Sequence, residues 1–249
     1  MRIVVVGGTG LIGTKLVAQL AEAGHKVLAA SRATGVNSFT TEGLADALTG
    51  AEVVVDVSNS SYTDEAAALE FFETSTLNLL TFGAAAGVRH HVALSVVGTD
   101  RLATSERGYF RAKFEQEKLI RNSGHQYSIV HATQFFEFLR SIADSATHGD
   151  TVRLAQAIIQ PMAADDVAAA VAGTALADPV NGIVEFAGPE RFTLLDGVKR
   201  QLSLVADPRE VVADPLATYF GNELDVAELL PGDDATLAST TWEQWRARS

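Results

Sequence analysis

Apolar positions in the first half of the chain fall into two patterns: short β-branched runs, and longer segments with apolar residues three or four positions apart. The first pattern predicts buried strands and the second predicts amphipathic helices. Strands are predicted at 2–6, 26–30, 51–57, 91–95 and 127–131, and helices at 14–23, 41–49, 65–86 and 110–123. Because the strands are separated by helices, we expect them to pair in parallel through right-handed crossovers.

The second half of the chain has a looser pattern. Helices are predicted at 135–147, 163–177, 193–204 and 241–248, and a further strand at 182–186. Together the two halves predict an α/β protein with a doubly wound parallel sheet. Residues 1–134 are expected to form the sheet core, and residues 135–249 the last sheet strands and a small C-terminal cap.

A glycine-rich loop joins the first predicted strand to the first helix. Backbone N–H groups and the helix dipole attract phosphate at such a junction, and glycines let the backbone approach closely. Glycine also occurs in plain tight turns, but a strand before the loop and a helix after it are the context of a dinucleotide-binding fingerprint. We therefore predict a Rossmann-type dinucleotide-binding core. The residues predicted to hold the cofactor here are Gly7, Thr9, Gly10, Leu11, Ile12 and Gly13.

The end of the second predicted strand bears on the choice between NAD and NADP. Proteins that bind NAD place an acidic residue there to hold the ribose 2′-hydroxyl. This strand is followed by Ser31 and Arg32, with no carboxylate. An arginine guanidinium suits a 2′-phosphate, so the sequence favours NADP, with NAD as the alternative if Arg32 is only a solvated surface residue.

Tyr109 and Lys113 stand four residues apart, which makes them neighbours on one face of a predicted helix. A cation close to a phenol lowers its pKa. Such a phenol can donate a proton to a carbonyl oxygen as hydride arrives. The pair therefore predicts acid–base chemistry, the alternative being an ordinary amphipathic helix with a surface lysine.

Polar residues also end two other predicted strands. Ser95 ends the strand at 91–95, and Ser58 and Asn59 follow the strand at 51–57. Ligands of open α/β sheets bind at the carboxyl ends of the strands. We expect Ser95 to bond a substrate or cofactor oxygen, or else to cap its own turn, and Ser58 and Asn59 to line the same crevice.

Composition narrows the function classes. The 249 residues carry a net charge of −12 and include no cysteine. The negative charge opposes binding to nucleic-acid phosphates, and the lack of cysteine excludes disulfides, zinc thiolates and cysteine nucleophiles. No apolar run has the length of a membrane span, and the start of the chain does not have the pattern of a signal peptide. We expect a cytoplasmic protein with a small-molecule substrate and no nucleic-acid or membrane partner.

No metal site is predicted. Asp165 and Asp166 are adjacent and point apart on a helix, and His90 and His91 face opposite sides of a strand. The sequence leaves the oligomeric state open.

These features together resemble the short-chain dehydrogenase/reductase superfamily, in its atypical, NmrA-like NAD(P)-binding branch. The similarity rests on GGTGLIG, the Tyr109–Lys113 pair, and the stretches 128–136, 160–167 and 187–190. It implies that Tyr109 is the acid/base, that Lys113 holds the nicotinamide ribose and tunes Tyr109, and that Ser95 matches the catalytic serine. The residues it places beside the nicotinamide and substrate are Gln134, Phe135 and Phe136. The chain departs from the family pattern at His131, where relatives usually carry arginine.

The resulting hypothesis is an NADPH-dependent oxidoreductase that transfers hydride to a small, fairly apolar carbonyl-type substrate. One alternative is a non-catalytic NAD(P)-binding redox sensor or regulator, which the retained Tyr109 and Lys113 speak against. The other is a sugar-nucleotide epimerase-like enzyme, although the C-terminal part offers few charged groups for a diphosphate.

Overall fold

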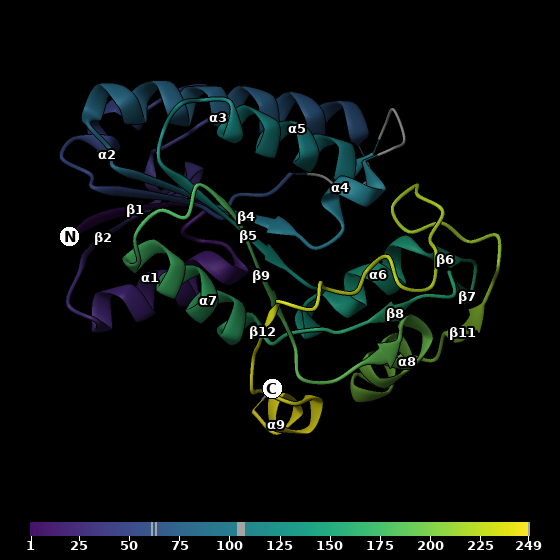
Figure 1. Cartoon of the computed structure of the whole chain (residues 1–249). Helices are drawn as coiled ribbons and strands as arrows, with labels where there is room; N and C mark the ends of the chain where they lie inside the picture. The colour runs from purple at the N-terminus through teal and green to yellow at the C-terminus, as the bar shows by residue number, and fades with distance from the viewer. Residues whose placement is uncertain (61, 63, 104–107, 249) are drawn as a thin grey trace.

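A parallel sheet forms the centre of the molecule (Figure 1). The computed structural model describes residues 1–60, 62, 64–103 and 108–248. Within these residues the sheet has seven strands in the order β12-β9-β5-β4-β3-β1-β2, and every neighbouring pair is parallel. The strands are β1 Arg2–Val6, β2 Lys26–Ala30, β3 Val53–Asp56, β4 His90–Val96, β5 Tyr127–Ala132, β9 Gly182–Ala187 and β12 Thr236–Leu237. The predicted doubly wound sheet is confirmed.

Helices cover both faces of the sheet (Figure 1). One face carries α2 Leu44–Leu48, α3 Glu65–Ala86 and α5 Tyr109–Arg121, and the other carries α1 Leu11–Glu22 and α7 Ala164–Leu176. Leu16 and Leu20 of α1 lie one turn apart and are fully buried beside Ile3 and Val5 of β1. Burial of each such leucine contributes about 1.5–3 kcal/mol, so the apolar stripe of α1 fixes the helix that follows the glycine loop.

The second half adds an extension beside the sheet. It contains η2 Phe136–Phe138, α6 Leu139–Ser145 and α8 Leu194–Leu204, with the short strands β6 Thr147–His148, β7 Thr151–Leu154, β8 Ile158–Ile159, β10 Phe192–Thr193 and β11 Glu210–Ala213. The last helix, α9 Trp242–Arg246, packs Trp242 and Trp245 against this extension. The division of the chain after residue 134 stays a prediction.

The strand order places a crevice at the carboxyl ends of β1 and β3. The chain runs from β1 outward to β2 and then returns to β3 on the other side of β1. Ligands bind at such a reversal in open α/β sheets. Among the described residues, no helix combines the length and the apolar character needed to cross a bilayer.

Candidate functional site

The glycine-rich loop after β1 has the geometry of a phosphate cradle. Gly7 has a φ of +79°, and a Cβ on it would lie 2.8 Å from the Cα of Ser58. A Cβ on Gly13 would lie 2.1 Å from the carbonyl oxygen of Gly7. Gly10 is the N-cap of α1, whose first turn has no acidic side chain, so the positive end of the helix dipole faces the loop. The cradle therefore fits the pyrophosphate of a dinucleotide.

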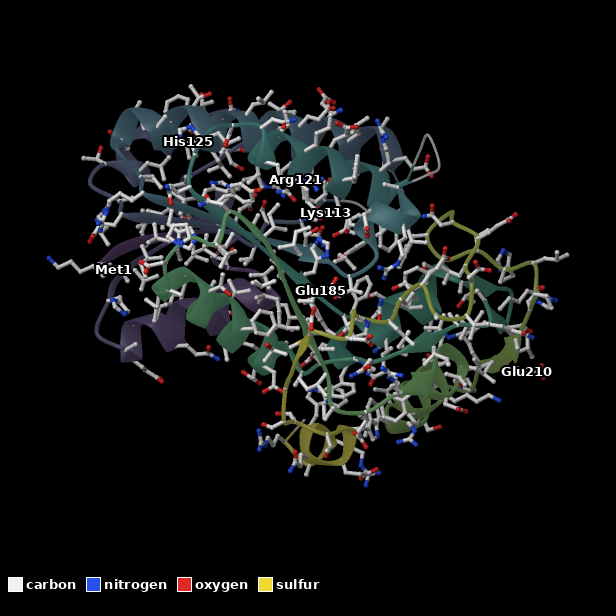
Figure 2. All side chains as sticks on the ribbon, in the orientation of Figure 1. Met1, Lys113, Arg121, His125, Glu185 and Glu210 are labelled. Atoms are coloured by element: carbon white, nitrogen blue, oxygen red, sulfur yellow. The ribbon has the colours of Figure 1, made fainter. Side chains whose placement is uncertain are left out.

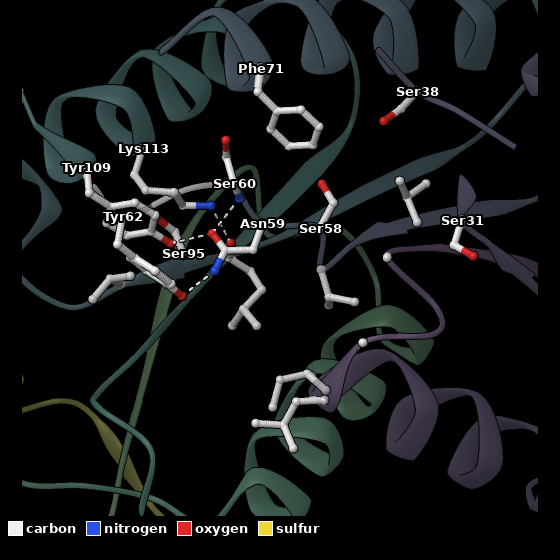
Figure 3. A pocket seen from close by; sticks show the side chains of 18 of the residues that line it. Ser31, Ser38, Ser58, Asn59, Ser60, Tyr62, Phe71, Ser95, Tyr109 and Lys113 are labelled. Atoms are coloured by element: carbon white, nitrogen blue, oxygen red, sulfur yellow. Dashed lines mark hydrogen bonds between the residues drawn. The ribbon is translucent and has the colours of Figure 1, made fainter. Parts of the chain in front are cut away.

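A cavity of about 1100 Å³ extends from this loop along the carboxyl ends of the strands (Figure 3). Its lining brings together most of the residues predicted from the sequence. These are Gly7, Thr9, Gly10, Leu11, Ile12, Ser31, Arg32, Ser58, Asn59, Ser95, Tyr109, Lys113, Gln134 and Phe135.

Two predicted site residues lie outside this lining. Gly13 belongs to α1, where its missing side chain lets the helix pack onto the loop. Phe136 is fully buried, with its ring centroid 5.4 Å from that of Trp242 and 5.3 Å from that of Trp245. The expected contact of Phe136 with substrate is wrong, because the chain enters η2 after Phe135 and directs the next ring into the C-terminal core.

Ser31 and Arg32 lie at the end of the cavity formed by β2. The backbone N–H of Ser31 donates to Thr34 Oγ1 at 2.9 Å and opens the short helix η1 Arg32–Thr34. This turn leaves Arg32 exposed at the cavity rim. The charged residues in the described lining are Arg32, Glu70 and Lys113, so a single carboxylate, that of α3, reaches this cavity.

Tyr109 begins α5 and lies in the cavity (Figure 3). Its hydroxyl donates to Asn59 Oδ1 at 3.0 Å, and the Asn59 amide contacts the Tyr62 hydroxyl. Burial first, and Tyr62 second, raise the pKa of Tyr109 well above its ordinary value. The prediction that Lys113 lowers this pKa is wrong in this structure. Tyr109 therefore holds its proton at neutral pH and is available as a donor.

The Lys113 ammonium is oriented by its own polar contacts. Its Nζ donates to the backbone oxygen of Leu94 at 2.8 Å and to the side-chain oxygen of Gln116. Gln116 in turn donates to Asp56 Oδ2 at 3.0 Å. Burial lowers the pKa of Lys113 to about 8, against the opposing effects of Asp56 and Glu117. Lys113 thus lines the cavity and is held there by hydrogen bonds that lead through Gln116 to Asp56, at the end of β3.

The Ser95 side chain forms a hydrogen bond that the sequence did not predict. Its hydroxyl donates to Glu117 Oε1 at 2.5 Å, and the same carboxylate oxygen lies 2.9 Å from His131 Nε2. Ser95 lies on β4, Glu117 on α5 and His131 on β5. No local spacing connects three residues on separate elements, so the sequence carried no signal for this group.

Aromatic rings missed by sequence reasoning form the remaining wall. Ring centroids of Tyr62 and Phe138 are 4.9 Å apart, and those of Tyr62 and Phe220 are 5.3 Å apart. Phe220 has a φ of +47° in a turn where Tyr219 and Asn222 exchange backbone hydrogen bonds. These side chains lie in segments without regular periodicity, although Tyr62 follows Asn59 by three residues and Phe138 follows Phe136 by two.

Gln134 offers polar atoms to the cavity. It is 4% exposed, and neither its Nε2 nor its Oε1 forms a hydrogen bond of ordinary geometry within the described residues. The amide lies beside the Tyr219 hydroxyl, where it opposes the rise in the pKa of Tyr219 that burial causes. Because a buried amide left unsatisfied is costly, Gln134 is suited to bind a ligand.

Comparison with known proteins gives one family match. A family model described as NAD(P)H-binding matches residues 7–179. The photosystem II assembly factor Ycf39 of Cyanophora paradoxa is 26% identical over 153 residues, which cover 56% of this chain and 47% of that protein. The chain thus matches about half the length of this curated relative.

Solved structures share the fold. The dTDP-glucose 4,6-dehydratase DesIV of Streptomyces venezuelae, solved with NAD and TYD, has a TM-score of 0.69 at 20% identity and covers 100% of this chain and 95% of its own. RMD of Pseudomonas aeruginosa, solved with NADPH, has a TM-score of 0.61 at 17% identity and covers 86% of each chain. At these identities the likeness extends to the fold alone.

Proposed function

The chain belongs to the NAD(P)H-binding family of atypical, NmrA-like short-chain dehydrogenases/reductases, and we propose that it is an NADPH-dependent reductase of small, uncharged, largely apolar carbonyl compounds. The observation that carries this proposal is the buried Tyr109 hydroxyl, which keeps its proton in a cavity continuous with the glycine cradle. A bound nicotinamide would supply the hydride.

The residues around Tyr109 support a role as proton donor. Asn59 accepts the Tyr109 hydroxyl hydrogen and so orients the phenol. Lys113 lies one helical turn along α5 and lines the same cavity. Thr9, Gly10 and the α1 N-terminus would hold the cofactor phosphates, and Lys113 would also contact the cofactor ribose.

Arg32 supports the choice of NADPH. Its guanidinium lies at the rim of the cavity beside Ser31, and β2 ends without a carboxylate. A 2′-phosphate there would receive charge-assisted hydrogen bonds. The competing arrangement is a ribose 2′-hydroxyl held by Glu70 from α3, which would favour NAD.

The aromatic wall supports an uncharged substrate. Tyr62, Phe138 and Phe220 surround the space next to Tyr109. Apart from Arg32 at the far end and Lys113, the described lining has no cation to neutralise a diphosphate. This lining argues against the epimerase-like alternative, which needs such contacts for a sugar nucleotide.

The test is NADPH oxidation by the purified protein with a panel of aromatic and aliphatic aldehydes and ketones. Tyr109→Phe is expected to lower kcat by roughly 10²- to 10⁴-fold, the usual contribution of a general acid, with unchanged NADPH affinity. Tyr127→Phe, on β5 outside the cavity lining, is the matched control and should keep full activity.

Two outcomes contradict the proposal. Full activity of Tyr109→Phe would remove this residue from the chemistry. Tight NADPH binding by the wild-type protein without turnover of any carbonyl would favour the redox-sensor alternative.

A further inference from the structure

A buried line of polar contacts runs from the cavity across the sheet. Ser95 Oγ donates to Glu117 Oε1 at 2.5 Å, and His131 Nε2 lies 2.9 Å from the same oxygen. On the other side of the imidazole, His131 Nδ1 lies 3.5 Å from Glu185 Oε1. Glu185 Oε2 accepts the backbone N–H of Gly232 at 2.7 Å. The line therefore joins a cavity residue to a loop near the surface.

The groups in this line differ sharply in exposure. The side chains of Glu117 and His131 are 1% and 3% exposed, whereas that of Glu185 is 23% exposed. Glu185 is thus the point at which solvent reaches the line. Figure 2 labels Glu185 on β9, at the exposed end of the line, and Lys113 on α5.

The charges around the imidazole favour its protonated form. Burial alone would lower the pKa of His131, but the hydrogen bonds to Glu117 and Glu185 outweigh it and raise that pKa. For Glu117, burial is likewise outweighed, by His131 first and then by Ser95 and Lys113, and its pKa is lowered. The hydrogen bond from His131 lowers the pKa of Glu185, with a smaller effect from Arg101. The triad is an imidazolium between two carboxylates.

In the triad formed by Glu117, His131 and Glu185, one carboxylate oxygen does not contribute a hydrogen bond to the described part of the fold. Glu117 Oε2 is buried and forms no hydrogen bond within the described residues. A carboxylate kept only for stability is costly when one oxygen stays unsatisfied in the interior. Hydroxyl, carboxylate and imidazole groups in unbroken contact are, in contrast, all able to accept one proton and release another.

We propose that Ser95, Glu117, His131 and Glu185 form a proton path that restores the Tyr109 proton after each turnover. This inference rests on the proposed reductase function. It assigns a role in supplying protons to Glu117 and His131, which do not belong to the described cavity lining.

Each turnover moves one hydride and one proton to the carbonyl group. Hydride adds to the carbonyl carbon, the C=O π electrons pass to the oxygen, and that oxygen takes the Tyr109 proton. His131 passes its Nε2 proton to the Glu117 carboxylate. The resulting Glu117 carboxylic acid donates that proton to Ser95 as Ser95 gives its own proton to the product oxygen, and the product hydroxyl returns its proton to the Tyr109 phenolate. Glu117 is then a carboxylate again, and the neutral His131 regains a proton from water at the Glu185 end. Each turnover consumes one hydride and one solvent proton.

The sharpest test is burst kinetics of Glu117→Gln, because the first turnover needs only the proton already on Tyr109. We expect a burst of one NADPH oxidised per site at the wild-type rate. A steady state slowed roughly 10- to 100-fold should follow, within the range of proton-transfer contributions. Glu115→Gln is the matched control on α5, since Glu115 pairs with Arg111 and Lys118 instead, and it should change neither phase.

A second variant and an NMR measurement test the same path if Glu117→Gln folds poorly. Glu185→Gln interrupts the solvent end and should give the same burst with a milder slowing. In histidine NMR titrations of the wild-type protein, His131 should stay protonated to higher pH than a free histidine, while buried His91, whose pKa burial lowers to about 4, should stay neutral.

Each failure has its own signature. A wild-type protein that oxidises no NADPH with any carbonyl would overturn the proposed function and the path with it. A wild-type protein that turns over, with Glu117→Gln unchanged or with both phases slowed equally, would overturn the path alone and leave Glu117 a structural residue. A His131 that titrates at or below its ordinary pKa would also overturn it.

Discussion

The two ends of the cavity are built in different ways. At the cradle end, Gly7, Gly10 and Gly13 shape the backbone itself, and seven consecutive residues supply the whole feature. At the reaction end, Ser95 bonds Glu117 and Tyr109 bonds Asn59, and these side chains come from β4, from α5 and from the segment after β3. A site made of backbone is encoded locally, whereas a site made of side chains exists only after the sheet has assembled.

The difference also affects how each end responds to change. Gly7, Gly8 and Gly13 tolerate no added atom, because backbone atoms lie within 3 Å of their missing Cβ positions, whereas the nearest atom at Gly10 is 3.3 Å away. The reaction end holds buried charges whose protonation states depend on one another. Substitutions should therefore act by steric exclusion at the first end and by electrostatics at the second.

At the cradle end, the largest effect is expected from Gly13→Ala. The new Cβ would meet the Gly7 carbonyl oxygen at 2.1 Å, so α1 and the loop must move apart. We expect NADPH affinity to fall by roughly 100-fold, about 2.8 kcal/mol, and the free energy of unfolding to fall by about 1–3 kcal/mol. Titration by cofactor fluorescence and denaturant unfolding measure the two.

Gly173→Ala is the matched control for this prediction. Gly173 lies on α7 with no atom within 4 Å of an added Cβ, so alanine should stabilise the protein by about 0.4–1 kcal/mol and leave NADPH affinity unchanged. Wild-type affinity in Gly13→Ala would contradict the cradle.

The fold was predictable where elements are long and regularly patterned. The strands at 2–6 and 26–30 and the helix at 65–86 have the predicted bounds. The predicted helix at 135–147 is instead η2 followed by α6 and the start of β6. The strands of the C-terminal extension have two to four residues each. Such segments are too short to show a period, and they form because tertiary packing favours them.

A smaller effect is expected at the rim of the cradle end, from Arg32→Ala. Loss of a charge-assisted contact to a 2′-phosphate should weaken NADPH binding by roughly 10- to 100-fold and leave NADH binding unchanged. Glu70→Gln is the matched arm, since Glu70 is the acidic residue in the described lining. If Glu70→Gln weakens NADH binding while Arg32→Ala changes nothing, the cofactor preference is the reverse of the proposed one.

The candidate site was predictable only in part, for the same reason as the fold. The glycine loop, Tyr109 and Lys113 follow short spacings that the sequence displays directly. Glu117 and His131 became neighbours of Ser95 only through the pairing of β4 with β5 and the packing of α5. The family resemblance assigned both Phe135 and Phe136 to the site, but the chain turns into η2 after Phe135, so Phe135 lines the cavity and Phe136 does not.

The smallest effect on function is expected at the aromatic wall. Phe220 holds a left-handed backbone with a φ of +47°, which costs about 1 kcal/mol for a residue of this kind. Phe220→Asn should relieve that strain, but it removes the ring that contacts Tyr62, Phe138 and Tyr219. Since each such contact contributes about 0.5–1.5 kcal/mol, the free energy of unfolding should fall by about 0.5–3 kcal/mol. The substitution should raise KM for an aromatic carbonyl several-fold, since one aromatic contact contributes about 0.5–1.5 kcal/mol, and leave KM for NADPH unchanged.

Ala206→Gly is the control, because Ala206 has a φ of +53° and does not belong to the described lining. It should relieve strain without any change in KM. An equal rise in KM for aliphatic and aromatic carbonyls in Phe220→Asn would show that the ring excludes water and does not recognise the substrate.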